Sequence, residues 1–277
     1  MYVIAEMNRI NFLIIGLFVV FATKAQQNHT ATIRKNNVAT VEKHQFIHAF
    51  EDNQDTCLLE YKEFNTLSQL AFHRIDMQCM GWNNIEERAY TYTDDGLAWV
   101  EIRRDNLLFA KTRYTYDGTT DPAQISTYYA MENDSVTSKN VYYRSRKNQL
   151  DSTLAYRTKS DGSTEAIRTI YRYDKHHHLV QQVASNQQGE LLDMVSYETS
   201  KEGKINSVAY TTYGENPSFK QIYYSYDQNG RIASTVDTQN RKQLYFYTPN
   251  GLLFNVLTYN GNGALEVEFL FKYTYHE

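Results

Sequence analysis

The sequence YSYDQNGRI at residues 224–232 decides the fold. Two tyrosines flank a polar residue, an Asp and an Asn-Gly pair follow, and an aliphatic residue then resumes. Alternate side chains of a β-strand point to the same face, so Tyr224 and Tyr226 share one face. Asn-Gly readily adopts the positive φ angles that a tight hairpin turn requires. The stretch therefore predicts the end of one strand, a hairpin turn and the start of a return strand.

The same pattern recurs along the chain, which is typical of a repeat architecture. Clear copies begin at Tyr114, Tyr171 and Tyr224, and weaker copies begin at Tyr90, Val141, Val195, Tyr245 and Tyr273. Their second aromatic residues stand at positions 92, 116, 143, 173, 197, 226, 247 and 275, so the steps are 24, 27, 30, 24, 29, 21 and 28 residues. A degenerate copy stands at Phe64, with Ser68 in the glycine place and Leu70 in the aliphatic place. Each unit is predicted to hold two short strands and two turns.

The repeat predicts an all-β fold, an antiparallel meander of tandem β-hairpins over residues 56–277. Cross-strand pairs of aromatic and branched side chains contribute roughly 0.2 to 1 kcal/mol each, so about eight units together stabilise what one hairpin cannot. About sixteen strands exceed what a flat twisted sheet normally carries. We therefore expect a strongly curled open sheet, a spiral or a partly closed barrel.

The N-terminus has the features of a secretory signal peptide. A charged start at Arg9, an apolar run over residues 10–22 and small residues before Gln26 predict a signal peptide at residues 1–25, with cleavage after Ala25. The apolar run is shorter than the roughly 20 residues of a membrane span, and no second candidate follows. We expect an exported protein with no transmembrane anchor after cleavage, which is periplasmic, cell-surface or secreted.

Residues 26–55 form a separate polar N-terminal segment in this interpretation. Within it, residues 41–50 are compatible with a short amphipathic helix or with a segment that covers an edge of the sheet. The second alternative has a physical reason, because an open sheet edge exposes unpaired backbone groups.

The Tyr-x-Tyr-Asp-x-x-Gly-x-Leu/Ile pattern resembles the YD repeats of Rhs-type proteins, teneurins and the cocoon subunits of insecticidal toxin complexes. The resemblance covers roughly four fifths of the mature chain. It implies β-hairpin units that spiral into a strip or shell. The toxins carry a self-cleaving boundary and a catalytic domain after their repeats, whereas this sequence ends at Glu277. The chain is therefore expected to be a small, exported, stand-alone member.

The net charge excludes one class of partner, and the cysteine content leaves one possible disulfide. The formal net charge is −4, and phosphate backbones are bound by clustered positive charge, so we expect no nucleic acid as partner. Cys57 and Cys79 are the two cysteines of the chain. In an oxidising compartment they form one disulfide or stay as two thiols, and the sequence leaves both alternatives open.

Histidines at two places are candidates for a metal site. Imidazole is a common metal ligand, and His176, His177 and His178 stand in a row. They take the place of the Asn-Gly turn, so a solvated turn explains them as well. His44 and His48 have helical i, i+4 spacing but lack the Glu of a zincin motif. We expect no metal at either place.

Catalysis finds no support in the sequence. Asp117, Asp174 and Asp227 recur with the period of the scaffold and are interpreted as turn formers. No nucleophile elbow, P-loop or dinucleotide fingerprint is present. The sequence therefore predicts no enzyme, no catalytic residue and no cofactor.

The tyrosine face is the remaining candidate for function. Aromatic rings beside polar side chains are common in carbohydrate and peptide sites. The candidate binding surface comprises Tyr114, Tyr116, Tyr171, Tyr173, Tyr224, Tyr226, Tyr245 and Tyr247. The same rings also fit the core of a thin sheet.

The sequence favours a binding or structural module of the cell envelope or exterior, which engages a glycan, a peptide or an envelope protein through the aromatic sheet face or a sheet edge. Two alternatives stay open. One is a metal-dependent hydrolase built around residues 176–178, and the other is a partner protein of a toxin system.

Overall fold

The computed structural model describes residues 27–48, 56–82, 84–118, 122–129, 136–145, 149–158 and 162–277, so the predicted signal peptide lies outside the described residues. Within these described residues, the helical elements are α2 (Gln27–Lys35) and the 3-10 helix η2 (Met77–Met80). Among the described residues, no helix has the length and apolar character that a membrane span requires. The strands are β1 (Val38–Ile47), β2 (Cys57–Phe64), β3 (Leu70–Asp76), β4 (Ile85–Thr93), β5 (Gly96–Arg104), β6 (Leu107–Thr115), β7 (Gln124–Tyr129), β8 (Val136–Arg144), β9 (Leu150–Thr158), β10 (Thr164–Tyr173), β11 (Leu179–Ser185), β12 (Leu191–Thr199), β13 (Ile205–Thr212), β14 (Ser218–Tyr226), β15 (Ile232–Asp237), β16 (Lys242–Tyr247), β17 (Leu253–Tyr259) and β18 (Leu265–Tyr275).

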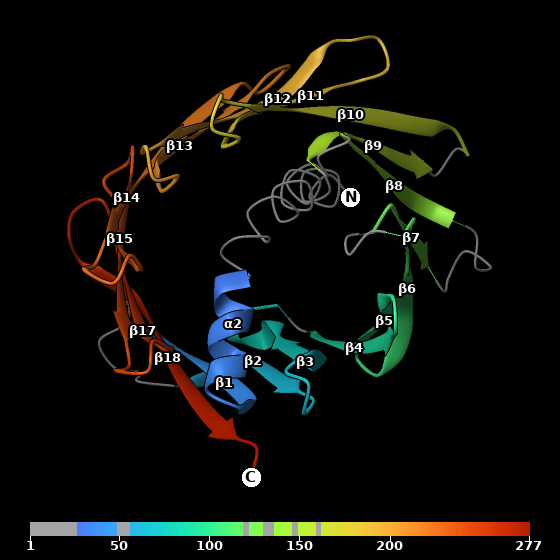
Figure 1. Ribbon diagram of the computed structural model, residues 1–277. Helices are drawn as coiled ribbons and strands as arrows, with labels where there is room; N and C mark the ends of the chain where they lie inside the picture. Colours follow the sequence, from blue (N-terminus) through green and yellow to red (C-terminus); the bar gives the residue numbers. More distant parts are fainter. Residues whose placement is uncertain are drawn as a thin grey trace.

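The strands form one closed antiparallel barrel. Each pairs with the strand before it and the strand after it, and β1 pairs with both β2 and β18. Figure 1 shows the resulting ring, whose strands follow one another around the wall in chain order. The predicted all-β meander is therefore confirmed: the described residues form 18 strands, where about sixteen were expected, and the ring closes completely. Among the described strands, none keeps a free edge.

The N-terminal segment closes this ring. Residues 41–47 belong to strand β1, so a helix over residues 41–50 is wrong, and the short helix α2 lies earlier, at Gln27–Lys35. The segment is extended because it fills the gap between two sheet edges: Val41 stands opposite Lys62 of β2 and Tyr273 of β18. Paired backbone groups on both sides outweigh the weak helical pattern of this stretch.

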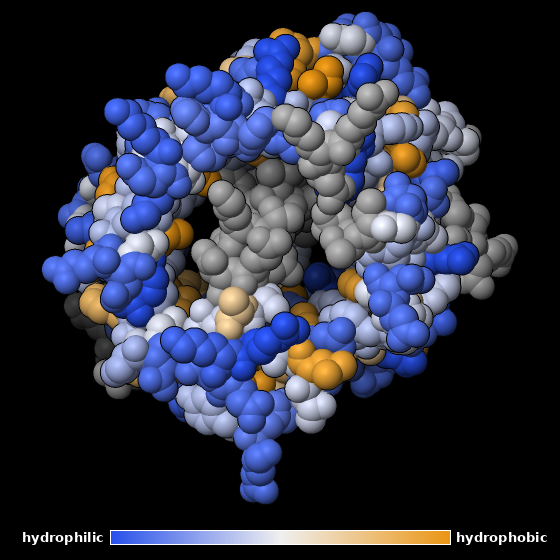
Figure 2. Space-filling model, viewed as in Figure 1, coloured by the Kyte–Doolittle hydropathy of each residue, from blue (hydrophilic) through white to orange (hydrophobic). Residues whose placement is uncertain are grey.

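Helix α2 identifies the inner face of the wall. Figure 1 shows it inside the ring, and its Ile33 is fully buried. Ile33 belongs to a core cluster against which Phe64, Phe271 and Tyr273 pack. The aromatic face predicted from the sequence therefore points to the interior of the ring. Seen from the same side, Figure 2 shows hydrophilic residues over most of the rim, with hydrophobic residues in separate small patches.

Six of the described turns share one side-chain geometry. Asp227 Oδ1 accepts hydrogen bonds from the backbone N–H groups of Asn229 (2.9 Å) and Arg231 (2.8 Å), and Gly230 has a φ of 76°. The same pair of bonds recurs in turns that begin at Asn65, Asp174, Asn186, Asp237 and Asn260. Asp174 and Asp227 are thus turn formers, as predicted. Ser68 has a φ of 58°, as its glycine place requires.

A tyrosine hydroxyl fastens each of several units to its neighbour. Tyr226 donates a hydrogen bond of 2.7 Å to the carbonyl of Ile205, the first residue of the adjacent strand β13. Equivalent bonds run from Tyr92 to Leu70, Tyr116 to Leu97, Tyr173 to Leu150, Tyr247 to Ile232 and Tyr273 to Leu253, with lengths between 2.6 and 3.0 Å. The second aromatic residue of the motif is therefore a clamp between neighbouring strands.

This bond corrects the alignment of the last copy, and the exposure of the rings corrects that of the copy in β8. In the last unit the clamping residue is Tyr273, so the copy is Phe271-Lys272-Tyr273, and Tyr275 is 52% exposed. In β8 the inward ring belongs to Tyr142, which is 8% exposed, while Tyr143 is 49% exposed. In both copies the sequence pattern puts the second aromatic residue too far along the chain, because adjacent or alternate tyrosines offer more than one match.

One disulfide joins the wall to a connection. Cys57 at the start of β2 is bonded to Cys79 in η2, with a Cα–Cα distance of 5.6 Å. Asp76 caps η2 by accepting a hydrogen bond from the N–H of Gln78. The disulfide therefore ties the connection between β3 and β4 to β2, the strand that pairs with β1.

The clamp predicts different effects for two tyrosines of β14. Tyr226→Phe removes the bond to the Ile205 carbonyl and should lower the free energy of unfolding by about 1 kcal/mol, the net value of a typical buried hydrogen bond. Tyr223→Phe is the control, because Tyr223 is 50% exposed on the outer face. Chemical denaturation of both variants measures the difference. Equal losses of stability in the two variants would contradict the clamp.

Candidate functional site

Charged side chains gather on the inner wall of strands β1 to β4. Lys43 of β1 stands opposite Glu60 of β2, and Lys62 of β2 stands opposite His73 of β3. His73 in turn stands opposite Arg88 of β4. Lys43 is two residues from Val41, which packs with helix α2, so this face is the inner one. The strands thus bring residues from four separate segments to one place.

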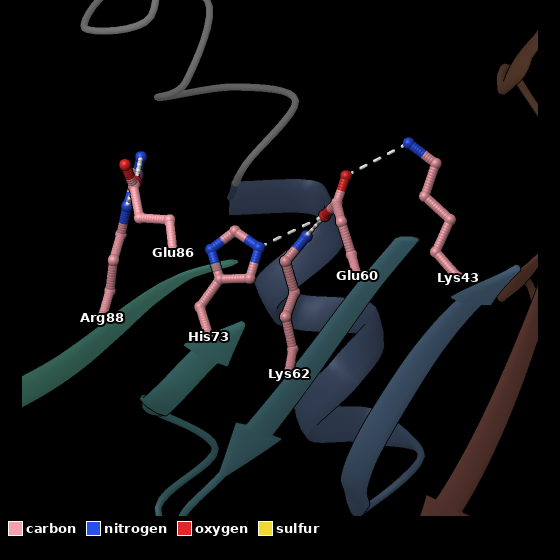
Figure 3. Close-up of polar contacts among 6 residues, drawn as sticks. All are labelled: Lys43, Glu60, Lys62, His73, Glu86 and Arg88. Carbon is pink, nitrogen blue, oxygen red and sulfur yellow. Dashed lines mark hydrogen bonds and ion pairs between the residues drawn. The ribbon is translucent and has the colours of Figure 1, made fainter. Parts of the chain in front are cut away.

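Glu60 is the centre of the first half of this cluster. Its Oε1 accepts a hydrogen bond of 3.1 Å from Lys43 Nζ, and its Oε2 accepts one of 2.7 Å from Lys62 Nζ. His73 Nε2 lies 3.3 Å from the same Oε2 but makes no hydrogen bond. Figure 3 shows these four side chains converging from β1, β2 and β3. Both carboxylate oxygens of Glu60 are therefore engaged, whereas a buried nitrogen of His73 is left without a hydrogen bond.

Glu86 of β4 is the centre of the second half. Arg88 donates to Glu86 Oε1 from Nε (2.8 Å) and from Nη2 (2.5 Å), and Arg104 of β5 donates to Oε2 from Nε (3.1 Å). The Arg104 guanidinium also lies over the ring of Phe109, 3.8 Å from its centroid. We call the seven residues Lys43, Glu60, Lys62, His73, Glu86, Arg88 and Arg104 the inner-wall cluster.

The cations of the inner-wall cluster are more accessible than its acids. The side chains of Lys43, Lys62, Arg88 and Arg104 are 22%, 30%, 38% and 43% exposed, whereas those of Glu60 and Glu86 are 21% and 12% exposed. Four cations and two carboxylates give a formal charge of +2 with His73 neutral, in a chain whose net charge is −4. The cluster therefore presents a positive surface whose acids lie mostly deeper.

The ionisation of the cluster follows from its contacts. Burial alone would raise the pKa of Glu60, but the contact with His73 and the charges of Lys62 and Lys43 hold it well below its usual range. Burial likewise opposes ionisation of Glu86, whose pKa is nevertheless lowered by Arg88 and Arg104. Burial lowers the pKa of His73. The contact with Glu60 raises this pKa, and the positive charges of Lys62 and Arg88 lower it, so the pKa remains below its usual value. At neutral pH both acids are charged and His73 is neutral.

The eight tyrosines proposed from sequence lie on the same inner face and are spread around the wall. Tyr171 is 5% exposed and packs with Tyr142, and Tyr224 packs against the cluster of Val195, Tyr197 and Val208. Burial raises the pKa of several of these phenols, to about 12 for Tyr114, Tyr173 and Tyr247. Tyr116, Tyr173, Tyr226 and Tyr247 are four of the six clamps described above. The clamps and the packed rings have a scaffold role, and binding by any of the eight stays a prediction.

The histidines considered for metal binding are held by other contacts. His177 has a φ of 65° and fills the glycine place of the turn that Asp174 begins. His178 Nδ1 lies 3.3 Å from Asp174 Oδ2. His44 lies on strand β1, not on a helix, and its Nε2 is 2.9 Å from Glu42. In the part of the chain that the structure describes, no three potential ligands gather around a point.

Sequence reasoning missed the inner-wall cluster, although one signal was present. Glu86, Arg88, Tyr90 and Tyr92 alternate in β4, so period 2 places the charges on the tyrosine face. Glu60 and Lys62 repeat this alternation in β2. Lys43 gave no such signal, because its segment lies outside the repeat.

Neither a protein-family model nor a curated protein matches the chain. Among solved structures, it is similar to a porin-like protein from Bacteroides uniformis ATCC 8492, with 9% identity, a TM-score of 0.44 and coverage of 86% of this chain and 98% of that chain. A porin-like protein from Bacteroides vulgatus ATCC 8482 gives 11% identity, a TM-score of 0.40 and the same coverage.

A chain of the complex TcdB2-TccC3-Cdc42 is similar over 82% of this chain, with 12% identity and a TM-score of 0.42. The match covers 14% of that chain, so this protein corresponds in length to a small part of it. At these identities and TM-scores, the likenesses say nothing about the ligand or activity of this chain.

The lowered pKa of His73 predicts a pH effect on stability. An unfolded histidine titrates near pH 6.5. Because the folded pKa lies below that value, protonation favours the unfolded chain, so the stability that neutral His73 contributes is present above about pH 6.5 and is lost as the pH falls through the folded pKa. The imidazole titration should be measured by NMR, with His73→Gln to assign the resonance. A midpoint at or above 6.5 would contradict the burial described here.

Proposed function

We propose that this chain is an exported binding module of the cell envelope or exterior, which holds a glycan or a peptide against the inner wall of its ring. The inner-wall cluster is the observation that carries this proposal. It joins four accessible cations to the tyrosine face at one sector of the wall, formed by strands β1 to β5.

The two mostly buried acids, Glu60 and Glu86, support a binding role of the cluster over a purely structural one. Removing charged groups from water costs several kcal/mol per ion, and well-packed apolar residues in place of a buried ion pair are often neutral or stabilising. If this sector of the wall served only to close the ring, apolar residues would serve equally well, as they do around Tyr197 and Val208. Retention of seven polar side chains in one sector is therefore better explained by a ligand.

The closed ring limits where a ligand binds. A sheet edge was one of the two docking sites considered from the sequence, but the described strands all have two neighbours. The aromatic face is the remaining docking site, and it lies inside the ring.

The size of the ring limits the shape of the ligand. Eighteen strands about 4.8 Å apart give a circumference of about 86 Å, or a diameter of about 27 Å between backbones before strand tilt is counted. Such a wall suits an extended chain better than the broad surface of a folded protein.

Two features support export. The N-terminal 25 residues have the order of a signal peptide, and the disulfide between Cys57 and Cys79 fits an oxidising compartment. With export, the partners are those of the periplasm, the cell surface or the medium, where glycans and peptides are abundant.

The test is binding by the mature chain, residues 26–277, to arrays of envelope glycans and of peptides, followed by calorimetry on each hit. The proposal expects at least one ligand, with affinity lowered at least about tenfold by Lys62→Gln combined with Arg104→Gln, because both cations lie on the inner wall. Lys111→Gln combined with Arg113→Gln is the matched control, since these residues lie on the outer face of β6 and remove the same charge. Binding that responds equally to both pairs, or no ligand in either array, would contradict it.

A further inference from the structure

We infer that the ligand of the inner-wall cluster is an acidic glycan, which places two anionic groups, carboxylates or phosphates, on the two halves of the cluster. This inference rests on the proposed function and specifies its ligand. Each half of the cluster has two cations and one acid: Lys43 and Lys62 share Glu60, and Arg88 and Arg104 share Glu86. Each half therefore has a net charge of +1, which one anionic group of a ligand would neutralise.

The cluster also has donors left over. Arg104 contacts Glu86 through Nε alone, so its two terminal nitrogens are not used by that bond. The planar guanidinium fork suits carboxylate and phosphate, which it binds through two parallel hydrogen bonds. His73 is 8% exposed, and its Nε2 faces Glu60 Oε2 at 3.3 Å, so its role is to hold Glu60 in place and it is not counted among these donors.

The two halves are spaced for a ligand with repeated charges. Glu60 stands opposite Ile75 of β3, and Ile75 stands opposite Glu86 of β4, so one strand separates the two acids. Two strand spacings amount to about 10 Å. A single small anion cannot reach both halves. An oligosaccharide with an acid group on every second or third sugar, or on each sugar of a bent chain, can do so.

A glycan fits the surroundings better than other polyanions. Tyr90 and Tyr92 continue the inner face of β4 beyond Arg88, and Arg88 itself contacts the Tyr90 hydroxyl. Aromatic rings offer flat apolar surface against which the C–H faces of a sugar pack. Nucleic acid demands a larger basic surface than a +2 cluster in an acidic chain. An acidic peptide is the remaining competitor, and the experiment distinguishes it.

The experiment measures binding of the mature chain to a glycan array in four arms: neutral glycans, uronate-bearing glycans, phosphate-bearing glycans and acidic peptides. We expect binding in one of the two acidic-glycan arms. For an uronate ligand, methyl esterification of its carboxylates should weaken binding at least about tenfold, and for a phosphate ligand, enzymatic removal of phosphate should do the same. Raising NaCl from 50 to 500 mM should weaken binding severalfold, because screening shortens the reach of charges.

Variants locate the site. Lys62→Gln combined with Arg104→Gln should lower affinity for the acidic glycan at least about tenfold, and Lys111→Gln combined with Arg113→Gln should leave it within about twofold. If the inner-wall pair does not fold, the salt and esterification arms on the unaltered chain still decide. Binding to neutral glycans alone, or to acidic peptides but not glycans, would overturn this inference and leave the proposed function standing. Absence of binding in every arm would end both.

Discussion

The structure depends on the removal of two free sheet edges. A meander of tandem hairpins has an unpaired edge at each end, and exposed edges template association with other chains. Strand β1 resolves this by pairing with β2 on one side and with β18 on the other, so the first and last strands of the repeat are joined through a segment that is not part of it. Closure turns the two faces of the sheet into an inner wall and an outer wall.

The inner wall owes both its aromatic rings and its charges to the two-residue period of the strands. The tyrosine motif lines most of it with rings, and hydroxyls such as that of Tyr226 fasten neighbouring strands near one end of the ring. In the sector next to β1, acids and cations take alternate positions on the same face, so charge appears beside the rings. Because Lys43 comes from β1 itself, the strand that closes the ring also completes the inner-wall cluster. Fold closure and the candidate site are therefore coupled.

Local features of this fold were predictable and long-range ones were not. The hairpins and turns follow from neighbouring residues, so even the degenerate turn at Ser68 was placed well. The last copy was misplaced because Phe271, Tyr273 and Tyr275 offer two alternate-residue pairs, and the bond from Tyr273 to Leu253 alone selects between them. Complete closure was not predictable, since the partner of β1 lies at the far end of the chain and the pairing has no sequence signature. Within the inner-wall cluster only Lys43 depends on that pairing, whereas the residues on β2 to β5 follow from consecutive hairpins and alternate with tyrosines in the sequence.

The closing pair of strands offers the most direct measurement. Thr40 of β1 and Thr274 of β18 stand opposite each other, with 2.7 Å between their hydroxyl oxygens. In the mature chain carrying Thr40→Cys and Thr274→Cys, oxidation should join the two cysteines within one molecule, and mass spectrometry of the digested protein should find the linked peptides. Thr40→Cys with Ser225→Cys, which lies on the distant strand β14, should give no such link. Failure of the first pair to link in a folded monomer, or links formed only between molecules, would show that the sheet is open and would contradict the closed ring.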